Sequence, residues 1–197
     1  INDIEQFGHT VAMPAHALAP DCRNIAEENL IDCVITSPPY LNGTNYIRNT
    51  KLELKMNDYV KSENDLALFH SKGIVSGINN VSKRNTTNII IPQIQKYIDR
   101  LQKCSYDKRI PVMISNYFYD MNEVFIHLRQ IMKANAVFIM DIGDSQFAGI
   151  HIPTHEILTE LCRNSGFLPY KDQVIRTRHS KNGMLLTQRL LKFRLSK

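Results

Sequence analysis

The chain has 197 residues, 43% hydrophobic and 22% charged, which is enough for one domain with a buried core. No apolar run approaches the roughly twenty residues that span a membrane, and the first residues lack the basic and apolar segments of a secretory signal. We therefore expect a cytoplasmic protein that does not contact a membrane. The formal net charge of +5 suits a polyanionic partner, although a plain basic surface has the same composition.

Cysteine and histidine offer no pattern for a metal site. The four cysteines are widely spaced, without the separation of a zinc knuckle or a redox motif, and we expect reduced, mostly buried thiols. His151 and His155 flank Pro153, but no third ligand accompanies them. We therefore predict no metal site.

The first third of the chain predicts an irregular lead-in, a strand and a helical region. Residues 1–20 are weakly patterned. Ile31 to Thr36 is apolar and β-branched and is followed by two prolines, which predicts a buried strand that ends in a loop. Residues 45–56 and 64–71 have helical spacing, and the polar stretch 76–88 predicts a surface loop.

The middle of the chain predicts two helices and a second strand. In residues 89–104, Ile94, Ile98 and Leu101 share one helical face after Pro92. Residues 119–133 show the clearest helical period, with Asp120 or Asn122 as candidate caps. Ala136 to Ile142 predicts a buried strand that Gly143-Asp144-Ser145 ends.

The last part predicts a helix and an antiparallel hairpin. Pro153 suits the start of a helix that Gly166 ends. Residues 167–178 and 186–195 predict two strands joined through Asn182-Gly183. The order is typical of an α/β fold: the rear half of a doubly wound, Rossmann-like sheet that ends in a hairpin, with a mostly helical insert.

The loop after the first predicted strand carries the chemistry. It contains Ser37, Pro38, Pro39 and Tyr40 at the carboxyl end of a strand, where such folds bind ligands. An exocyclic base amine is a poor nucleophile, and two acceptors, the Ser37 hydroxyl and the Pro38 carbonyl, would orient its lone pair. The prolines hold these acceptors in place, and Tyr40 can stack on a flipped base. A rigid turn without chemistry is the alternative.

This segment resembles the catalytic segment of DNA amino-methyltransferases. The resemblance rests on residues 32–42, DCVITSPPYLN, and the serine is more similar to the cytosine-N4 branch than to the adenine-N6 branch. Later segments of the family resemble residues 45–48 with 51–54, 141–145 with 152–154, and 190–194, so the similarity covers most of residues 21–197. The poorly matched insert, about 57–110, is the natural place for target recognition.

The resemblance implies S-adenosylmethionine as cofactor and double-stranded DNA as partner. Ser37 and Pro38 would border the methyl donor. Asp21 would contact its adenine amine, although a turn cap is an equal alternative for that residue. The family's glycine-rich cofactor loop has no match; Phe7 to Thr10 is the nearest candidate and lacks a second glycine.

The missing loop leaves three explanations. The chain is a subunit of a split enzyme whose complementary subunit carries the cofactor loop, a fragment that lacks an N-terminal segment, or a degenerate relative. Because the catalytic loop is intact, we favour the first two. A site-specific cytosine-N4 methyltransferase of a restriction-modification system is the leading hypothesis. Adenine-N6 methylation and a non-catalytic DNA-binding or specificity subunit are the alternatives.

Basic and polar residues around the loop and near the terminal hairpin are candidate DNA contacts. The candidates are Asn45, Arg48, Lys51, Arg176, Arg178 and Lys181. A solvated surface predicts the same residues. In the insert, Lys83, Arg84 and the run Asn85 to Asn88 are candidates for reading base edges. Asp141 and Asp144, at the end of a strand, are functional candidates, and loop hydrogen bonding is the favoured interpretation for Asp144.

Overall fold

The computed structural model describes residues 16, 18, 21–25, 28–81 and 91–197, and within them the fold is mixed α/β. A four-stranded sheet has the order β1 (Ile31–Thr36), β2 (Met132–Gly143), β6 (Leu185–Leu195) and β5 (Phe167–His179). β1 and β2 are parallel, whereas β6 is antiparallel to both β2 and β5. The lead-in expected for residues 1–20 lies almost wholly outside the described residues.

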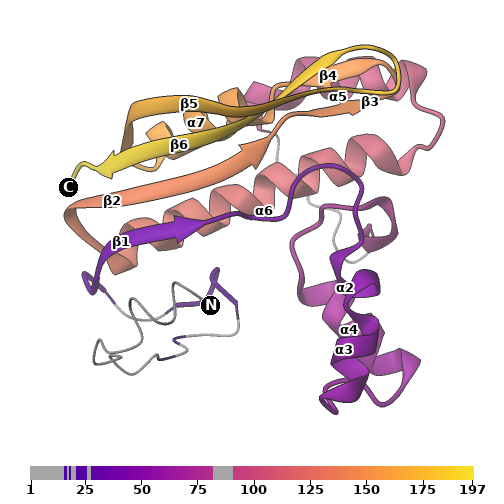
Figure 1. Ribbon diagram of the computed structural model, residues 1–197, viewed down its shortest axis with the longest axis horizontal. Coiled ribbons are helices and arrows are strands. Elements are labelled where there is room, and N and C mark those ends of the chain that lie inside the picture. The colour runs from indigo at the N-terminus through magenta and orange to yellow at the C-terminus, as the bar shows by residue number, and fades with distance from the viewer. Residues whose placement is uncertain (1–15, 17, 19–20, 26–27, 82–90) are drawn as a thin grey trace, which may run out of the picture.

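Phe138 of β2 is at the centre of the core. Its ring lies 6.0 Å from that of Phe125, 5.5 Å from that of Phe167 and 5.6 Å from that of Phe193. Phe125 belongs to the long helix α6 (Arg109–Ile131), which runs along the sheet (Figure 1). Two further helices, α5 (Pro92–Cys104) and α7 (Thr154–Asn164), add buried side chains to the same core.

The two faces of the sheet are covered unequally. Val34 of β1 is in register with Phe138, and both contribute to the core. Their neighbours Ile35 and Ile139 are also in register, and alternation along a strand places them on the opposite face. There Ile139 is half-buried and Ile35 is 75% exposed. The prediction that β1 is a buried strand is therefore wrong, because in the described part of the chain β1 is an edge strand with one largely uncovered face.

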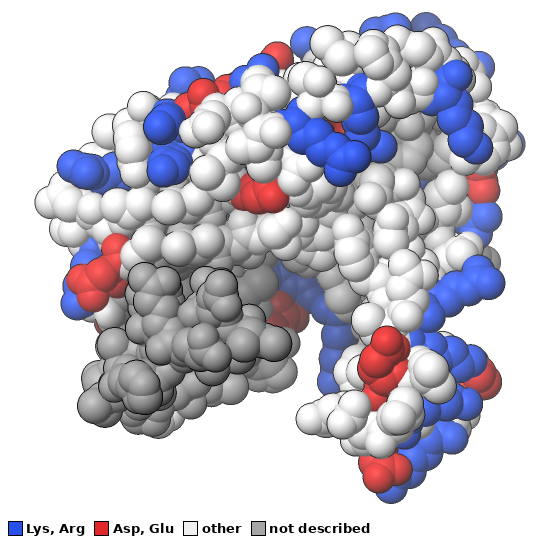
Figure 2. All heavy atoms as spheres, in the orientation of Figure 1, with Lys and Arg blue, Asp and Glu red and all other residues white. Residues whose placement is uncertain are grey.

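Three short helices form an arm that projects from the sheet. They are α2 (Tyr46–Asn49), α3 (Lys51–Met56) and α4 (Glu63–Lys72), and Figures 1 and 2 show them standing away from the body. The helical predictions for residues 45–56 and 64–71 are confirmed, with a break at Thr50. α4 begins with a capping box in which Ser62 and Asp65 satisfy each other's backbone N–H groups.

A surface loop is predicted for residues 76–88, but its described part, residues 76–81, is mostly buried or half-buried. Ser76 and Asn80 are buried, and Ile78–Asn80 forms the short 3₁₀ helix η1. The Ser76 carbonyl accepts the N–H of Gly43 at 3.1 Å. This segment therefore supports the turn that follows Ser37 to Tyr40, which we call the motif loop. The Ser76 hydroxyl donates to the Thr44 carbonyl at 3.3 Å, and the Asn80 side chain lies 3.3 Å from His70 Nδ1. Residues 82–90, including Lys83, Arg84 and the asparagine run, lie outside the described residues.

α6 begins ten residues before the predicted start at residue 119. Buried side chains such as Ile114 and Tyr117 extend the apolar face, and Pro111 lies in the first turn, where a missing N–H is tolerated. Asp120 is therefore no cap: it lies inside the helix and binds other segments. β2 also begins earlier than predicted, at Met132.

The rest of the chain follows the prediction closely. α7 follows Pro153, and both Gly166 and Gly183 adopt positive φ angles, of +86° and +77°, as a helix end and a hairpin turn require. A small hairpin of β3 (Ser145–Phe147) and β4 (Ile150–Ile152) was not predicted. No helix within the described ranges is long and apolar enough to cross a membrane.

The thiols are unpaired but not mostly buried. All four cysteines are free, and only Cys162 is buried, whereas Cys22, Cys33 and Cys104 are exposed. The expectation of mostly buried thiols is therefore wrong. Cys33 is exposed for the same reason as Ile35, since both lie on the uncovered face of β1.

Candidate functional site

The motif loop leaves β1 at the carboxyl edge of the sheet and borders an open cavity. Ser37 is exposed, Pro38 is buried, and Pro39 and Tyr40 are half-buried. The cavity measures about 330 Å³ and is lined by these four residues and Tyr46. The structure therefore brings together the four residues predicted to be catalytic and leaves the Ser37 side chain accessible to a ligand.

Tyr40 is held by a hydrogen-bonded network that joins three parts of the chain. Its hydroxyl donates to Asp141 at 2.9 Å, and the Gln188 side-chain amide donates to the Tyr40 hydroxyl and to both Asp141 carboxylate oxygens, each at 2.9 Å. Asp141 lies on β2 and Gln188 on β6. The loop is therefore fastened to the two central strands through one phenol.

Gly143 allows this ring to lie against the end of β2. A methyl group at this position would lie 3.2 Å from one ring carbon of Tyr40 and 3.3 Å from another. The glycine is in register with Gln188, so β2, β6 and the Tyr40 ring meet here. Close packing of this kind is a reason for glycine that is independent of turn conformation.

The network keeps the Tyr40 phenol protonated. Burial raises the pKa of Tyr40, and the Asp141 carboxylate raises it further, while Ser37 and Gln188 act in the opposite direction. A protonated phenol continues to donate to Asp141 throughout the neutral range. Tyr40 therefore forms one wall of the cavity, and its hydrogen bond to Asp141 holds that wall in place.

Tyr46 completes the cavity from the first helix of the arm. Its hydroxyl accepts the backbone N–H of Tyr40 at 3.1 Å, and the side chain is 39% exposed. Asn45 caps the same helix by accepting the Arg48 N–H at 2.9 Å. The arm and the motif loop are thus joined at the cavity.

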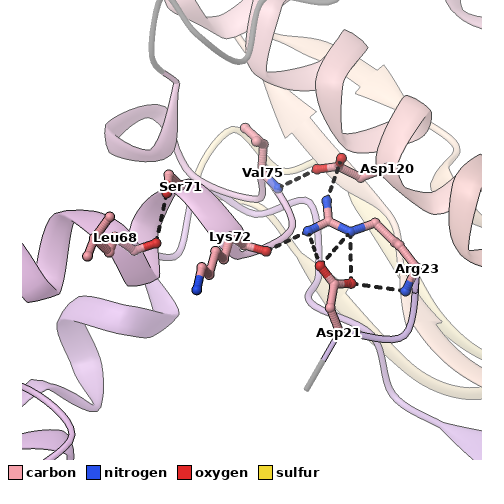
Figure 3. Close-up of polar contacts among 7 residues, drawn as sticks. All are labelled: Asp21, Arg23, Leu68, Ser71, Lys72, Val75 and Asp120. Atoms are coloured by element: carbon pink, nitrogen blue, oxygen red, sulfur yellow. Dashed lines mark hydrogen bonds and ion pairs between the residues drawn. The ribbon is translucent and has the colours of Figure 1, made fainter. Parts of the chain in front are cut away.

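Asp21 lies in an ion-pair cluster with Arg23 and Asp120, which Figure 3 shows. Arg23 donates to both carboxylate oxygens of Asp21 at 2.8–3.3 Å and to Asp120 at 2.9 Å. It also donates to the Lys72 carbonyl at the end of α4, and Asp120 accepts the Val75 N–H at 3.0 Å. The cluster therefore joins the segment before β1 to the arm and to α6.

The pKa values of the two carboxylates in this cluster shift in opposite directions. The hydrogen bond from Arg23 lowers the pKa of Asp21, whereas burial raises the pKa of Asp120 despite the Val75 N–H and Arg23. Asp21 also accepts the Arg23 backbone N–H at 2.9 Å, which is the turn cap considered above. It is not among the residues that line the motif cavity. A cofactor contact by Asp21 stays a prediction.

Asp144, just beyond β2, is the centre of a second polar cluster. It is 3% exposed, lies 2.6 Å from His155 Nδ1 and accepts the Thr187 hydroxyl at 2.9 Å. His151 Nε2 lies 3.4 Å away. Burial alone would raise the pKa of Asp144, but the contacts with His155 and Thr187 outweigh it and the pKa is lowered. Asp144 therefore fixes the β2–β3 connection to α7 and β6, in agreement with the loop hydrogen bonding favoured above.

The predicted DNA contacts fall in two separate places. Arg48 and Lys51 lie on the arm, and Lys51 pairs with Glu63 at 2.6 Å. Arg176, Arg178 and Lys181 are exposed on β5 and its turn. Figure 2 shows Lys and Arg side chains both on the arm and over the part of the molecule where β5 and β6 lie. Binding of DNA by these residues stays a prediction.

The sequence did not predict the roles of Gln188, Gly143, Tyr46 and Tyr117. Gln188 and Gly143 act through register between β2 and β6, which no local pattern encodes. Tyr117 is fully buried in α6, its hydroxyl has no hydrogen-bond partner in the described part of the chain, and burial raises its pKa. A local signal existed only for Tyr46, which follows the motif at short range.

The chain is similar in sequence to Type II methyltransferases. It is 29% identical over 166 residues to M.AvaI of Nostoc sp. and to M.AvaI of Anabaena variabilis. It is 24% identical over 173 residues to M.BsoBI of Geobacillus stearothermophilus. Each match covers 77% of this chain and 34% of the relative, so the chain spans about a third of the length of the curated relatives it matches. No family model matches the chain.

The similarity to solved structures is weaker. TTHA0409 of Thermus thermophilus, which is described as a DNA modification methylase, aligns over 57% of this chain and 44% of its own, with 12% identity and a TM-score of 0.36. Its structure complexed with S-adenosyl-L-methionine gives 15% identity and a TM-score of 0.34 over 43% of this chain and 39% of its own. These values are too low to support a conclusion about the fold.

Proposed function

We propose that this chain is the catalytic half-domain of a site-specific DNA methyltransferase that methylates the N4 amine of cytosine in a restriction-modification system. The observation that carries the proposal is the loop Ser37 to Tyr40, fixed at the carboxyl edge of the sheet beside an open cavity. The similarity to Type II methyltransferases supports the same class of enzyme.

The proposed mechanism assigns one task to each part of the loop. The Ser37 hydroxyl oxygen and the Pro38 carbonyl accept the two hydrogens of the target amine and direct its lone pair toward the methyl donor. Tyr40 stacks on the flipped base, and the network with Asp141 and Gln188 keeps its ring in place. Prealigned acceptors lower the barrier because they need no rearrangement during transfer.

S-adenosylmethionine supplies the methyl group in this proposal. Ser37 and Pro38 border the cavity in which its reactive end would meet the amine. The eight glycines of the sequence include no Gly-x-Gly pattern, so most contacts with the cofactor must come from elsewhere in the complete enzyme. Among the described residues, β1 has an uncovered face and a free edge, and such a segment or subunit would pack there.

A Ser37→Ala substitution in the complete enzyme tests the mechanism. Loss of one prealigned acceptor should lower the methylation rate on the order of a hundredfold, while DNA affinity is retained. Ser71→Ala, an exposed serine on α4, is the matched control and should leave the rate unchanged. An unchanged rate in the Ser37 variant would contradict the proposed mechanism.

Mass analysis of nucleosides from methylated DNA tests the target base. N4-methylcytosine is expected, and N6-methyladenine would favour the alternative.

Titration of the isolated chain with S-adenosylmethionine tests the need for a complementary segment. We expect weak binding that tightens when the rest of the enzyme is added, and tight binding by the chain alone would contradict this part of the proposal.

A further inference from the structure

The two tyrosines at the motif cavity are not equivalent. Tyr40 both donates and accepts side-chain hydrogen bonds, in the network with Asp141 and Gln188. Tyr46 uses its hydroxyl only as an acceptor, for the Tyr40 N–H at 3.1 Å. No described residue accepts the hydroxyl proton of Tyr46. This proton is therefore available to a ligand in the cavity that both rings line.

The polar groups of the cavity form a complementary set. A tyrosine hydroxyl has one hydrogen to donate, and its oxygen is already engaged by the loop backbone. The exposed Ser37 hydroxyl lines the same cavity and can accept a hydrogen bond. The cavity thus offers a donor from α2 and an acceptor from the motif loop to the edge of one flat ligand.

The Watson–Crick edges of the bases differ in this respect. Cytosine and adenine both present an amine hydrogen next to a ring nitrogen that accepts. Guanine and thymine present a carbonyl oxygen next to a ring N–H that donates. A Tyr46 donor beside a Ser37 acceptor therefore matches cytosine and adenine. With guanine or thymine, donor would face donor and acceptor would face acceptor, which leaves the polar groups of the bound base unpaired.

We propose that Tyr46 is a specificity-determining residue whose hydroxyl donates a hydrogen bond to the ring nitrogen beside the target amine. This inference rests on the proposed function and adds the group that recognises the base. The Tyr46 hydroxyl would contact both the Tyr40 N–H and the base. Recognition of the base would therefore depend on an ordered motif loop.

A cycle that pairs a protein change with a base change tests this contact. The complete enzyme and its Tyr46→Phe variant are assayed on DNA with cytosine at the target and on DNA with 3-deazacytosine, in which the ring nitrogen is a C–H group. If the nucleoside analysis gives adenine, 1-deazaadenine takes its place. The value of kcat/KM for methylation is measured for each of the four combinations of enzyme and DNA, and the four values are compared.

The expected result is coupling between the two changes. The wild-type enzyme should lose an additional factor on the order of tenfold on the deaza base relative to the loss that the variant shows, because a donor facing C–H is left unpaired. The changed electronics of the deaza base affect both enzymes equally and cancel in the comparison. Equal losses in the two enzymes, or no effect of Tyr46→Phe on cytosine, would overturn the proposal.

Two controls separate base recognition from general damage. Tyr59→Phe removes a hydroxyl from a residue of the same arm that is 68% exposed, and it should show neither a loss nor coupling. The melting temperature of Tyr46→Phe should fall by no more than about a few degrees, since the ring is kept and only the hydrogen bond to the Tyr40 N–H is lost. A wild-type enzyme that transfers no methyl group would end the proposed function together with this inference, whereas an active enzyme without coupling would end the inference alone.

Discussion

The parallel neighbours β1 and β2 have similar apolar sequences but different surroundings. Side chains of β2 on the helix-covered face, including Phe138, are fully buried, and β6 pairs with its other edge. β1 has one free edge within the described structure and leaves Ile35 75% exposed. The motif loop, Ser37 to Tyr40, follows the less protected strand. Contacts outside β1 hold this loop and the turn after it: the Tyr40 network at the end of β2, the Tyr46 hydroxyl and the Ser76 carbonyl.

The largest expected effect is a difference between the two strands in how much a side chain contributes to the free energy of unfolding. Phe138→Ala should lower the free energy of unfolding by about 3–5 kcal/mol, because it empties a site enclosed by three other rings. Ile35→Ala should change it by less than about 0.5 kcal/mol in the isolated chain. Urea unfolding of both variants measures the contrast, and similar losses would show that β1 is as well covered as β2.

Weakening the network that joins the motif loop to β2 and β6 should have an intermediate effect on the free energy of unfolding. Gln188→Met removes the donor to Tyr40 and Asp141 with little change in volume, and we expect a loss of about 1–2 kcal/mol in unfolding free energy. Methylation by the complete enzyme should fall with it. Gln173→Met, on the exposed strand β5, is the matched control. A neutral Gln188 variant would show that the loop is held by other contacts.

The cluster just beyond β2 predicts a smaller, pH-dependent effect. Since the folded pKa of Asp144 is lowered, the unfolded chain takes up this proton first as the pH falls. The stabilisation by Asp144 is therefore present above its ordinary pKa of 3.8 and is lost as the pH falls through the folded value.

Unfolding midpoints between pH 6 and about pH 3 measure this contribution. Asp144→Asn should reduce the acid dependence, because its amide cannot take up the proton. Asp32→Asn, on the exposed carboxylate of β1, should retain most of the dependence. A variant at position 144 with the wild-type pH profile would contradict the assignment.

The smallest effect on stability is expected at Tyr117, a fully buried residue of α6. Its buried hydroxyl has no hydrogen-bond partner among the described residues. Tyr117→Phe should therefore leave the free energy of unfolding within about 0.5 kcal/mol of wild type or raise it, because no partner is lost. Thermal unfolding measures this. A clear destabilisation would indicate a partner such as bound water.

Local patterns predicted much of the element order. Pro92 and Pro153 marked helix starts, and Gly166 and Gly183 marked positive-φ ends, because these residues restrict or permit backbone angles on their own. The start of α6 was missed, since polar residues such as Asn116 interrupt the apolar period while tertiary packing extends the helix. The small β3–β4 hairpin was missed because its strands have only three residues each.

The sequence by itself determined the motif, its place after an apolar strand and the chemistry that Ser37 and Pro38 suggest. These depend on residue types that are adjacent in the chain. Only the tertiary structure decided that β1 is an exposed edge among the described residues, that Gln188 and Asp141 both bind the Tyr40 hydroxyl, and that Tyr46 lines the same cavity. Such contacts join residues up to 148 positions apart, so they depend on strand register and packing rather than on any local pattern.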